Sequence, residues 1–144
     1  NLKIKIKMDI NLLFKICNTL VLPFWLALIF APEHKLVKNL VTTIAILLAL
    51  VYASLVPIFL EMEEGGFGSL EEVMLLFKNP KAVLAGWIHY LVFDLLTGRW
   101  IALEAIKNGI SKWYIGPCLL FTLMLGPVGF LLFTILKYFH LKKN

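Results

Sequence analysis

The stretch GWIHYLVFDLLTGRW, residues 86–100, lies in the middle of a long apolar run, yet it contains His89, Asp94 and Arg99. A charged side chain at the centre of a bilayer costs at least about 2.5 kcal/mol on insertion scales. Ionisable residues at this depth indicate either a functional site or polar contacts between helices. In the second interpretation, Asp94 bonds Tyr90 or an asparagine of another helix, and Arg99 reaches the lipid head groups.

The composition of the 144-residue chain indicates a membrane protein with a single domain, residues 1–144. Hydrophobic residues make up 60% of the chain and charged residues 16%, whereas soluble domains carry about 25% charged residues. The formal net charge is +5, but the lysines stand at the chain ends and between apolar runs, where they anchor helices to head groups. Membrane lipid is therefore the expected surrounding, and no nucleic-acid partner is expected. Cys17 and Cys118 lie inside apolar runs and are interpreted as packing residues.

Four apolar runs are long enough to cross a membrane. They cover about residues 10–31, 40–60, 82–106 and 114–138, close to the ~20 residues that a hydrocarbon core requires. Backbone groups in lipid have no other partners, so these runs should be helices. The predicted fold is an all-α membrane protein with four transmembrane helices in one bundle.

The segment between the second and third runs contains turn and cap signals. Gly65, Gly66 and Gly68 favour a turn, and Ser69 followed by Glu72 fits a capping box at a helix N-terminus. A short amphipathic helix at the membrane interface is one interpretation of the residues that follow. A solvated connector is the other.

The chain ends give expectations about topology and compartment. In a four-span arrangement, basic residues are more numerous on the side of both termini, so we expect both termini in the cytoplasm. Residues 1–7, NLKIKIK, are interpreted as disordered or as translated upstream DNA before a start at Met8. A native basic strip beside the membrane is the alternative. We find no cleavage pattern after the first run and no Ser- and Arg-rich leader before it, and we expect a bacterial inner membrane.

The polar residues of the third run fall on different faces of a helix. At about 100° per residue, Trp87, Tyr90 and Asp94 share one face, whereas His89 and Trp100 lie on roughly the opposite one. Because ionisable groups cannot stay unpaired in hydrocarbon, both His89 and Asp94 should face protein or a polar cavity. The third helix is therefore expected at the centre of the bundle.

A polar stripe is also predicted on the first helix. Asn11, Lys15, Asn18 and Trp25 follow spacings of four, three and seven residues. Asn18 lies deep enough to need a hydrogen-bond partner from another helix. A packing role and a site role stay open for this asparagine.

The motifs exclude several chemistries. The three histidines, His34, His89 and His140, stand alone in separate segments, whereas membrane di-iron sites need closely spaced histidine pairs. Neither the H-E-x-x-H pattern, nor the G-x-S-x-G pattern, nor a Gly-rich phosphate loop is present. No metal site and no cofactor are expected, and Gly126-Pro127-Val128-Gly129 is interpreted as a helix break.

The pattern W-I-H-x-x-x-x-D-L-x-x-G-R-W, residues 87–100, resembles the abscisic-acid-deficient-four-like family of small four-helix membrane proteins. Further matching features are Pro23-Phe24-Trp25, Tyr52 and the Gly126–Gly129 segment, so the resemblance covers the chain from Met8 onward. The family includes plant plastid members associated with neoxanthin synthesis. The resemblance implies an isomerase that opens a carotenoid end-ring epoxide to an allene, on a carotenoid or other isoprenoid substrate.

Such a step needs one group to protonate the epoxide oxygen and another to remove a carbon-bound proton. His89, Asp94 and Arg99 are the expected catalytic residues, and the roles of acid and base stay open between the first two. The expected substrate contacts are Asn18, Trp25, Tyr52, Trp87, Tyr90 and Trp100. Two other functions stay open: a non-catalytic carotenoid- or lipid-binding protein, and a structural subunit. A homo-oligomer or a membrane-complex partner is compatible with each.

Overall fold

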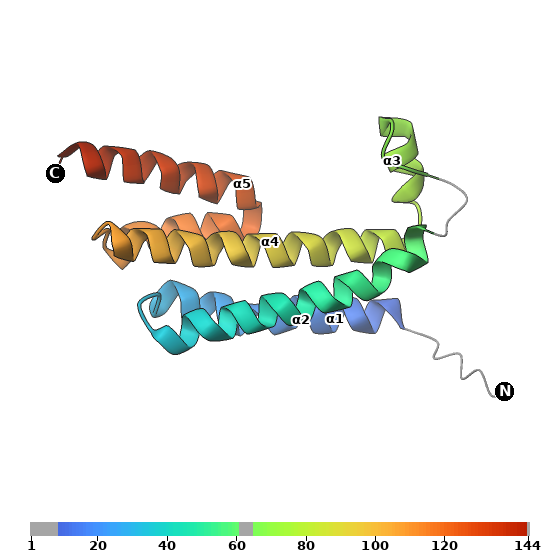
Figure 1. Ribbon diagram of the computed structural model, residues 1–144, viewed down its shortest axis with the longest axis horizontal. Helices are drawn as coiled ribbons and strands as arrows, with labels where there is room; N and C mark the ends of the chain where they lie inside the picture. The colour runs from blue at the N-terminus through green and yellow to red at the C-terminus, as the bar shows by residue number, and fades with distance from the viewer. Residues whose placement is uncertain (1–8, 61–64, 144) are drawn as a thin grey trace.

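The computed structural model describes residues 9–60 and 65–143. It contains five helices along the chain and no strand in this described part (Figure 1). The helices are α1 (Ile10–Phe30), α2 (Lys35–Leu60), α3 (Leu70–Leu76), α4 (Pro80–Lys107) and α5 (Lys112–Lys143). The all-α prediction is confirmed. The interpretation of residues 1–7 and of a start at Met8 falls outside the described residues.

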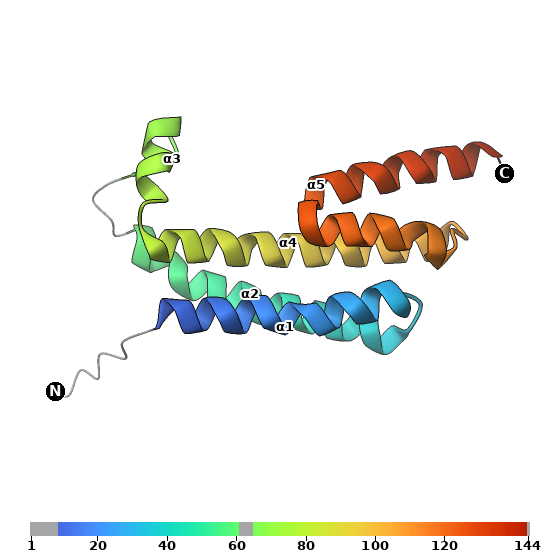
Figure 2. The ribbon, with the colours of Figure 1, turned by 180° about the vertical axis from the view of Figure 1, so that it is seen from behind.

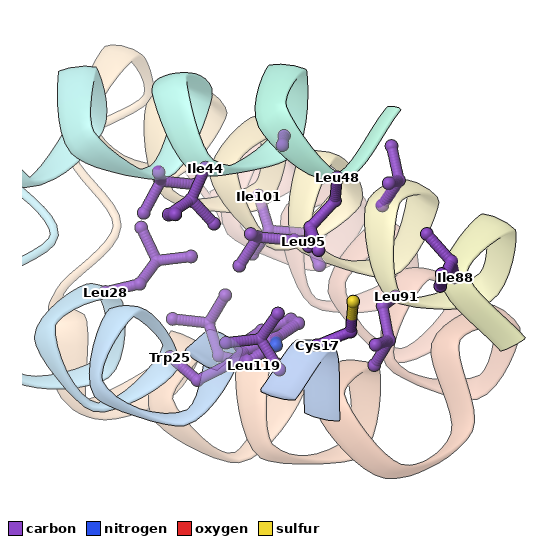
Figure 3. Close-up of a cluster of buried hydrophobic side chains, with 14 of the residues drawn as sticks. Cys17, Trp25, Leu28, Ile44, Leu48, Ile88, Leu91, Leu95, Ile101 and Leu119 are labelled. Carbon is purple, nitrogen blue, oxygen red and sulfur yellow. The ribbon is translucent and has the colours of Figure 1, made fainter. Parts of the chain in front are cut away.

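Helix α4 is the central element, as expected. It contacts α2, α5 and α1, and Figures 1 and 2 show it running along the length of the structure between the others. Figure 3 shows the apolar core that joins these helices, with Trp25 from α1, Leu48 from α2, Leu95 from α4 and Leu119 from α5. All four side chains are almost completely buried. The core therefore holds α4 from several sides at once.

Local signals fix where the helices begin. The Asp9 carboxylate accepts hydrogen bonds from the backbone amides of Asn11 and Leu12 at 3.0 and 3.1 Å, which caps α1. Asn79 caps α4 by accepting from the Lys81 amide at 2.9 Å, and Pro80 occupies the first turn. Such caps satisfy amides that have no partner within the helix.

The short helix expected after the glycine turn is present as α3. The Ser69 hydroxyl accepts from the Glu72 amide at 3.2 Å, which is the first half of a capping box. The Glu72 carboxylate accepts from the Gly68 amide, at 2.9 Å, rather than from the Ser69 amide. The connector thus contains a short helix whose N-terminus is held by hydrogen bonds from within the connector itself. Its position at a membrane interface stays a prediction.

Helix α5 differs from the straight fourth span expected over residues 114–138. Leu125 has φ −146° and ψ 67°, which interrupts the helix, and the second arm folds back beside the first (Figures 1 and 2). The Lys137 ammonium reaches the Glu104 carboxylate at 2.7 Å, so the second arm returns to the C-terminal end of α4. The first arm, residues 112–124, is only about 20 Å long at 1.5 Å per residue, below the ~30 Å of a hydrocarbon core. The straight crossing expected over residues 114–138 is therefore not found as one continuous helix.

The fold-back also changes the placement of the chain ends. Helix α1 begins at one end of the bundle, and α5 ends at the other (Figures 1 and 2). The expectation that both termini share one side does not fit this arrangement, because it assumed that α5 runs the full length of the bundle once.

Three helices, α1, α2 and α5, are long and apolar enough to cross a membrane by length and composition. Helix α4, which holds the expected third span, is as long as these but is not among them. It carries Lys81, Asp94, Arg99, Glu104 and Lys107 along its length, which lowers its mean hydropathy. The predicted four-span bundle is thus found only in part.

Candidate functional site

The two ionisable residues at the middle of α4 lie on different sides of this helix. Asp94 is half-buried and faces α5, whereas His89 is exposed and faces α2. This separation follows from their spacing of five residues, which turns the helix by about 140° from one side chain to the other. The structure therefore does not bring the two expected proton-transfer groups into one pocket.

Asp94 packs against the bend of α5. A Cβ atom added to Gly126 would lie only 2.7 Å from the carboxylate carbon of Asp94, so this contact requires glycine. The Asp94 Oδ2 atom is buried and forms no hydrogen bond within the described part of the chain. A buried carboxylate oxygen without a hydrogen bond is costly, so this atom calls for an explanation.

Tyr90 lies one helical turn before Asp94 and ties α4 to the bend. Its hydroxyl, which has one proton to donate, lies 3.0 Å from the Leu123 carbonyl oxygen and 3.3 Å from that of Met124, and the shorter contact is to Leu123. Pro127 lacks an amide hydrogen, so it cannot donate to the carbonyl of Leu123 four residues earlier. The tyrosine hydroxyl supplies the donor that the proline removes.

A cleft of about 260 Å³ opens beside Tyr90, between α1, α4 and α5. The Trp87 indole donates to the Asn18 side-chain oxygen at 3.2 Å across this cleft, which confirms that Asn18 bonds another helix. Val21, Leu91 and Leu123 contribute apolar walls. The cleft therefore combines an apolar lining with a few polar groups at its edge, the usual character of small-molecule sites.

His89 lines a second cleft, of about 230 Å³, on the other side of α4. Its ring lies 5.7 Å from the Tyr52 ring and 4.8 Å from the Phe93 ring, measured between centroids. The residues around α3 complete the walls with Phe67 and Phe77. Tyr52 and His89 thus belong to one site, and Asn18, Trp87 and Tyr90 to another.

The other expected site residues lie away from both clefts. The Arg99 guanidinium donates from Nε to the Lys38 carbonyl at 3.2 Å, so it joins α4 to α2 rather than orienting Asp94. Trp25 is buried against Gly98, where a Cβ would lie 2.7 Å from the indole. The Trp100 ring contacts the second arm of α5, through Phe130 at 5.4 Å and Phe133 at 5.6 Å. These three residues pack helices together.

The family model described as ABA DEFICIENT 4-like matches residues 12–133. The chain belongs to this family. A curated relative, the Arabidopsis thaliana protein named ABA DEFICIENT 4, chloroplastic, is 28% identical over 127 residues, which cover 81% of this chain and 56% of the relative. The chain thus spans little more than half the length of that relative. No solved structure matches the chain.

The ABA DEFICIENT 4-like match contains both clefts and the bend of α5, and it ends before Lys137 and His140. Within it, two contacts of the Asp94 side were not foreseen from the sequence, namely Gly126 against the carboxylate and Leu123 as an acceptor. The second had a readable signal, because a proline four residues later always frees a helical carbonyl. No three side chains of His, Cys, Asp or Glu gather as a metal site within residues 9–60 and 65–143.

Proposed function

We propose that this protein is a membrane isomerase that opens the end-ring epoxide of a carotenoid, or of a related isoprenoid lipid, to an allene. Membership of the ABA DEFICIENT 4-like family supports the substrate class, since the family resemblance implies neoxanthin-type chemistry. The observation that carries the proposal is the Asp94 Oδ2 atom, which is buried, without a hydrogen bond in the described part of the chain, one helical turn from Tyr90, a residue that lines the apolar cleft.

The reaction is an isomerisation, so its atoms and electrons balance without a redox partner. One carbon–oxygen bond of the epoxide breaks, and the oxygen gains a proton to become a hydroxyl. A proton leaves a neighbouring carbon, and its electron pair forms the new double bond of the allene. The proton gained and the proton lost are equal in number, so a single carboxyl group can donate one and accept the other.

Asp94 is the residue that we assign to this proton exchange, with Tyr90 holding the bend of α5 in place beside it. His89 stays outside the assignment, because it lies on the other side of α4. The Asn18–Trp87 pair stands at the edge of the cleft, where a ring hydroxyl of the substrate can bond it. An apolar cleft suits a substrate that is delivered from lipid.

The test compares two isosteric changes, Asp94→Asn and Asp9→Asn, in membranes supplied with epoxycarotenoids. These are the two aspartates of the chain, and asparagine caps a helix as well as aspartate does, so the second change is a matched control. We expect Asp94→Asn to lower turnover about 10²- to 10⁴-fold, the usual effect of losing a general acid or base. Asp9→Asn should leave turnover unchanged.

Three outcomes separate the functions. Loss of turnover with unchanged melting in Asp94→Asn supports the isomerase. Full turnover in Asp94→Asn rejects the assignment of Asp94. Pigment bound by the wild-type protein without any conversion rejects the isomerase and leaves the non-catalytic binding protein.

A further inference from the structure

The cleft on the His89 side of α4 is not used by the reaction proposed at Asp94. It lies between α2, α4 and the residues that flank α3, with a volume of about 230 Å³. Its floor is a stripe of small residues, Ala82, Ala85 and Gly86, which lead to His89 along one face of α4. Phe77 rests on this floor, since a Cβ at Gly86 would lie 2.9 Å from the phenyl ring. The Phe77 ring therefore packs where Gly86 has no side chain, and Tyr52 and His89 line the cleft beyond it.

Aromatic rings form the walls of this cleft and leave two polar groups available. The Tyr52 and His89 rings lie 5.7 Å apart between centroids, and Phe67 and Phe77 also line the cleft. Neither the Tyr52 hydroxyl nor the His89 imidazole has a hydrogen bond to another residue of the described chain. Both groups can donate and accept.

The wall beside α3 is held in place by its own bonds. The Gly66 amide donates to the Glu72 carbonyl at 3.2 Å, and the Gly68 amide to the Glu72 carboxylate at 2.9 Å. Gly65 has φ +97°, and a Cβ there would collide with the backbone of Leu76. The backbone of this turn, which carries Phe67 and Phe77 at its two ends, is thereby held before any ligand arrives, which lowers the entropy cost of binding.

We infer that this cleft binds the ring end of a lipid whose ring carries a hydroxyl or keto oxygen. The flat apolar ring would lie among the aromatic side chains that line the cleft, and its oxygen would bond Tyr52 and His89. A plain hydrocarbon tail would leave both polar groups without a partner. This site is separate from the conversion at Asp94, because the two clefts lie on different sides of α4.

The experiment uses two ring probes that differ by one hydroxyl, 3-hydroxy-β-ionone and β-ionone. The full chain is labelled at its three histidines and placed in lipid nanodiscs, and the His89 ring signals are followed by NMR during titration. Partition of each probe into empty nanodiscs is measured and subtracted. We expect a saturable shift of the His89 signals, with about five-fold tighter binding of the hydroxylated probe, the value of one neutral hydrogen bond.

Tyr52→Phe removes one hydroxyl and keeps the ring, so it should reduce the preference for the hydroxylated probe while β-ionone binds as before. Tyr138→Phe, on an exposed tyrosine of α5, is the matched control and should change neither affinity. The inference is overturned if the His89 signals do not saturate, if both probes bind equally, or if Tyr52→Phe keeps the full preference. Asp94→Asn should leave probe binding intact, which distinguishes failure here from failure of the proposed isomerase.

Discussion

The surroundings of the ionisable residues Asp94 and His89 differ between the two sides of α4. On the Asp94 side, a glycine on the neighbouring helix lets the α5 bend press against the carboxylate. On the His89 side, small residues on α4 itself leave a cleft in front of the imidazole. Gly126 thus admits the Asp94 carboxylate, whereas Gly86 admits the Phe77 ring. The contrast teaches that a single helix can hold one polar group under tight packing and offer another to a ligand.

The largest expected effect comes from forcing the arms of α5 apart. Gly129→Leu places a side chain against the Thr122 amide and the Cys118 carbonyl, which are backbone atoms and cannot move aside. Overpacking of this kind costs about 1 to 3 kcal/mol or more. We expect a large drop in melting temperature and loss of any activity at Asp94, with probe binding at the His89 cleft retained.

Gly116→Leu is the matched control for this change, since nothing lies within 4 Å of a Cβ at Gly116 on the same helix. It should melt close to the wild-type temperature. Equal melting of the two leucine variants would contradict the fold-back of α5 and the packing of its arms.

A smaller effect is expected from Tyr90→Phe. The change leaves the carbonyl of Leu123 without its donor, because Pro127 supplies none. Interhelical hydrogen bonds in membranes are worth about 0.6 to 2 kcal/mol. Thermal unfolding in detergent should show a modest loss of stability, which Tyr138→Phe should not share.

The smallest effect is expected from Lys137→Met. The ion pair between Lys137 and Glu104 is partly exposed, so water screens it and its contribution is small. We expect Lys137→Met to lower the melting temperature less than Tyr90→Phe does. The difference in melting temperature between Lys137→Met and the wild-type protein should shrink as salt is added to both. A loss larger than that of Tyr90→Phe would mean that this pair, rather than the packing at Gly129, holds the second arm.

Some of this comparison could be read from the sequence. The spacing of His89 and Asp94 predicted their separation around the helix, and the depth of Asn18 predicted its bond to another helix, which Trp87 provides. The reversal of α5 could not be predicted, because Gly126 and Pro127 fit a mild kink as well as a complete turn. One residue, Leu125, makes the difference through its backbone angles. The hydrogen-bond partner of Arg99 could not be predicted either. It is the backbone carbonyl of Lys38, and because every residue has such a carbonyl, the sequence does not single this one out.

The fold-back of α5 decides whether the two ends of the described chain lie at the same end of the bundle. Helices α1, α2 and α4 each travel the length of the bundle, whereas α5 returns to the end from which it starts (Figures 1 and 2). Because only α1, α2 and α4 run the full length of the bundle, the first and last described residues lie at its opposite ends. Reporter domains fused to the two ends should therefore read opposite compartments, and an insertion that straightens α5 at Leu125 should bring both reporters to the same one.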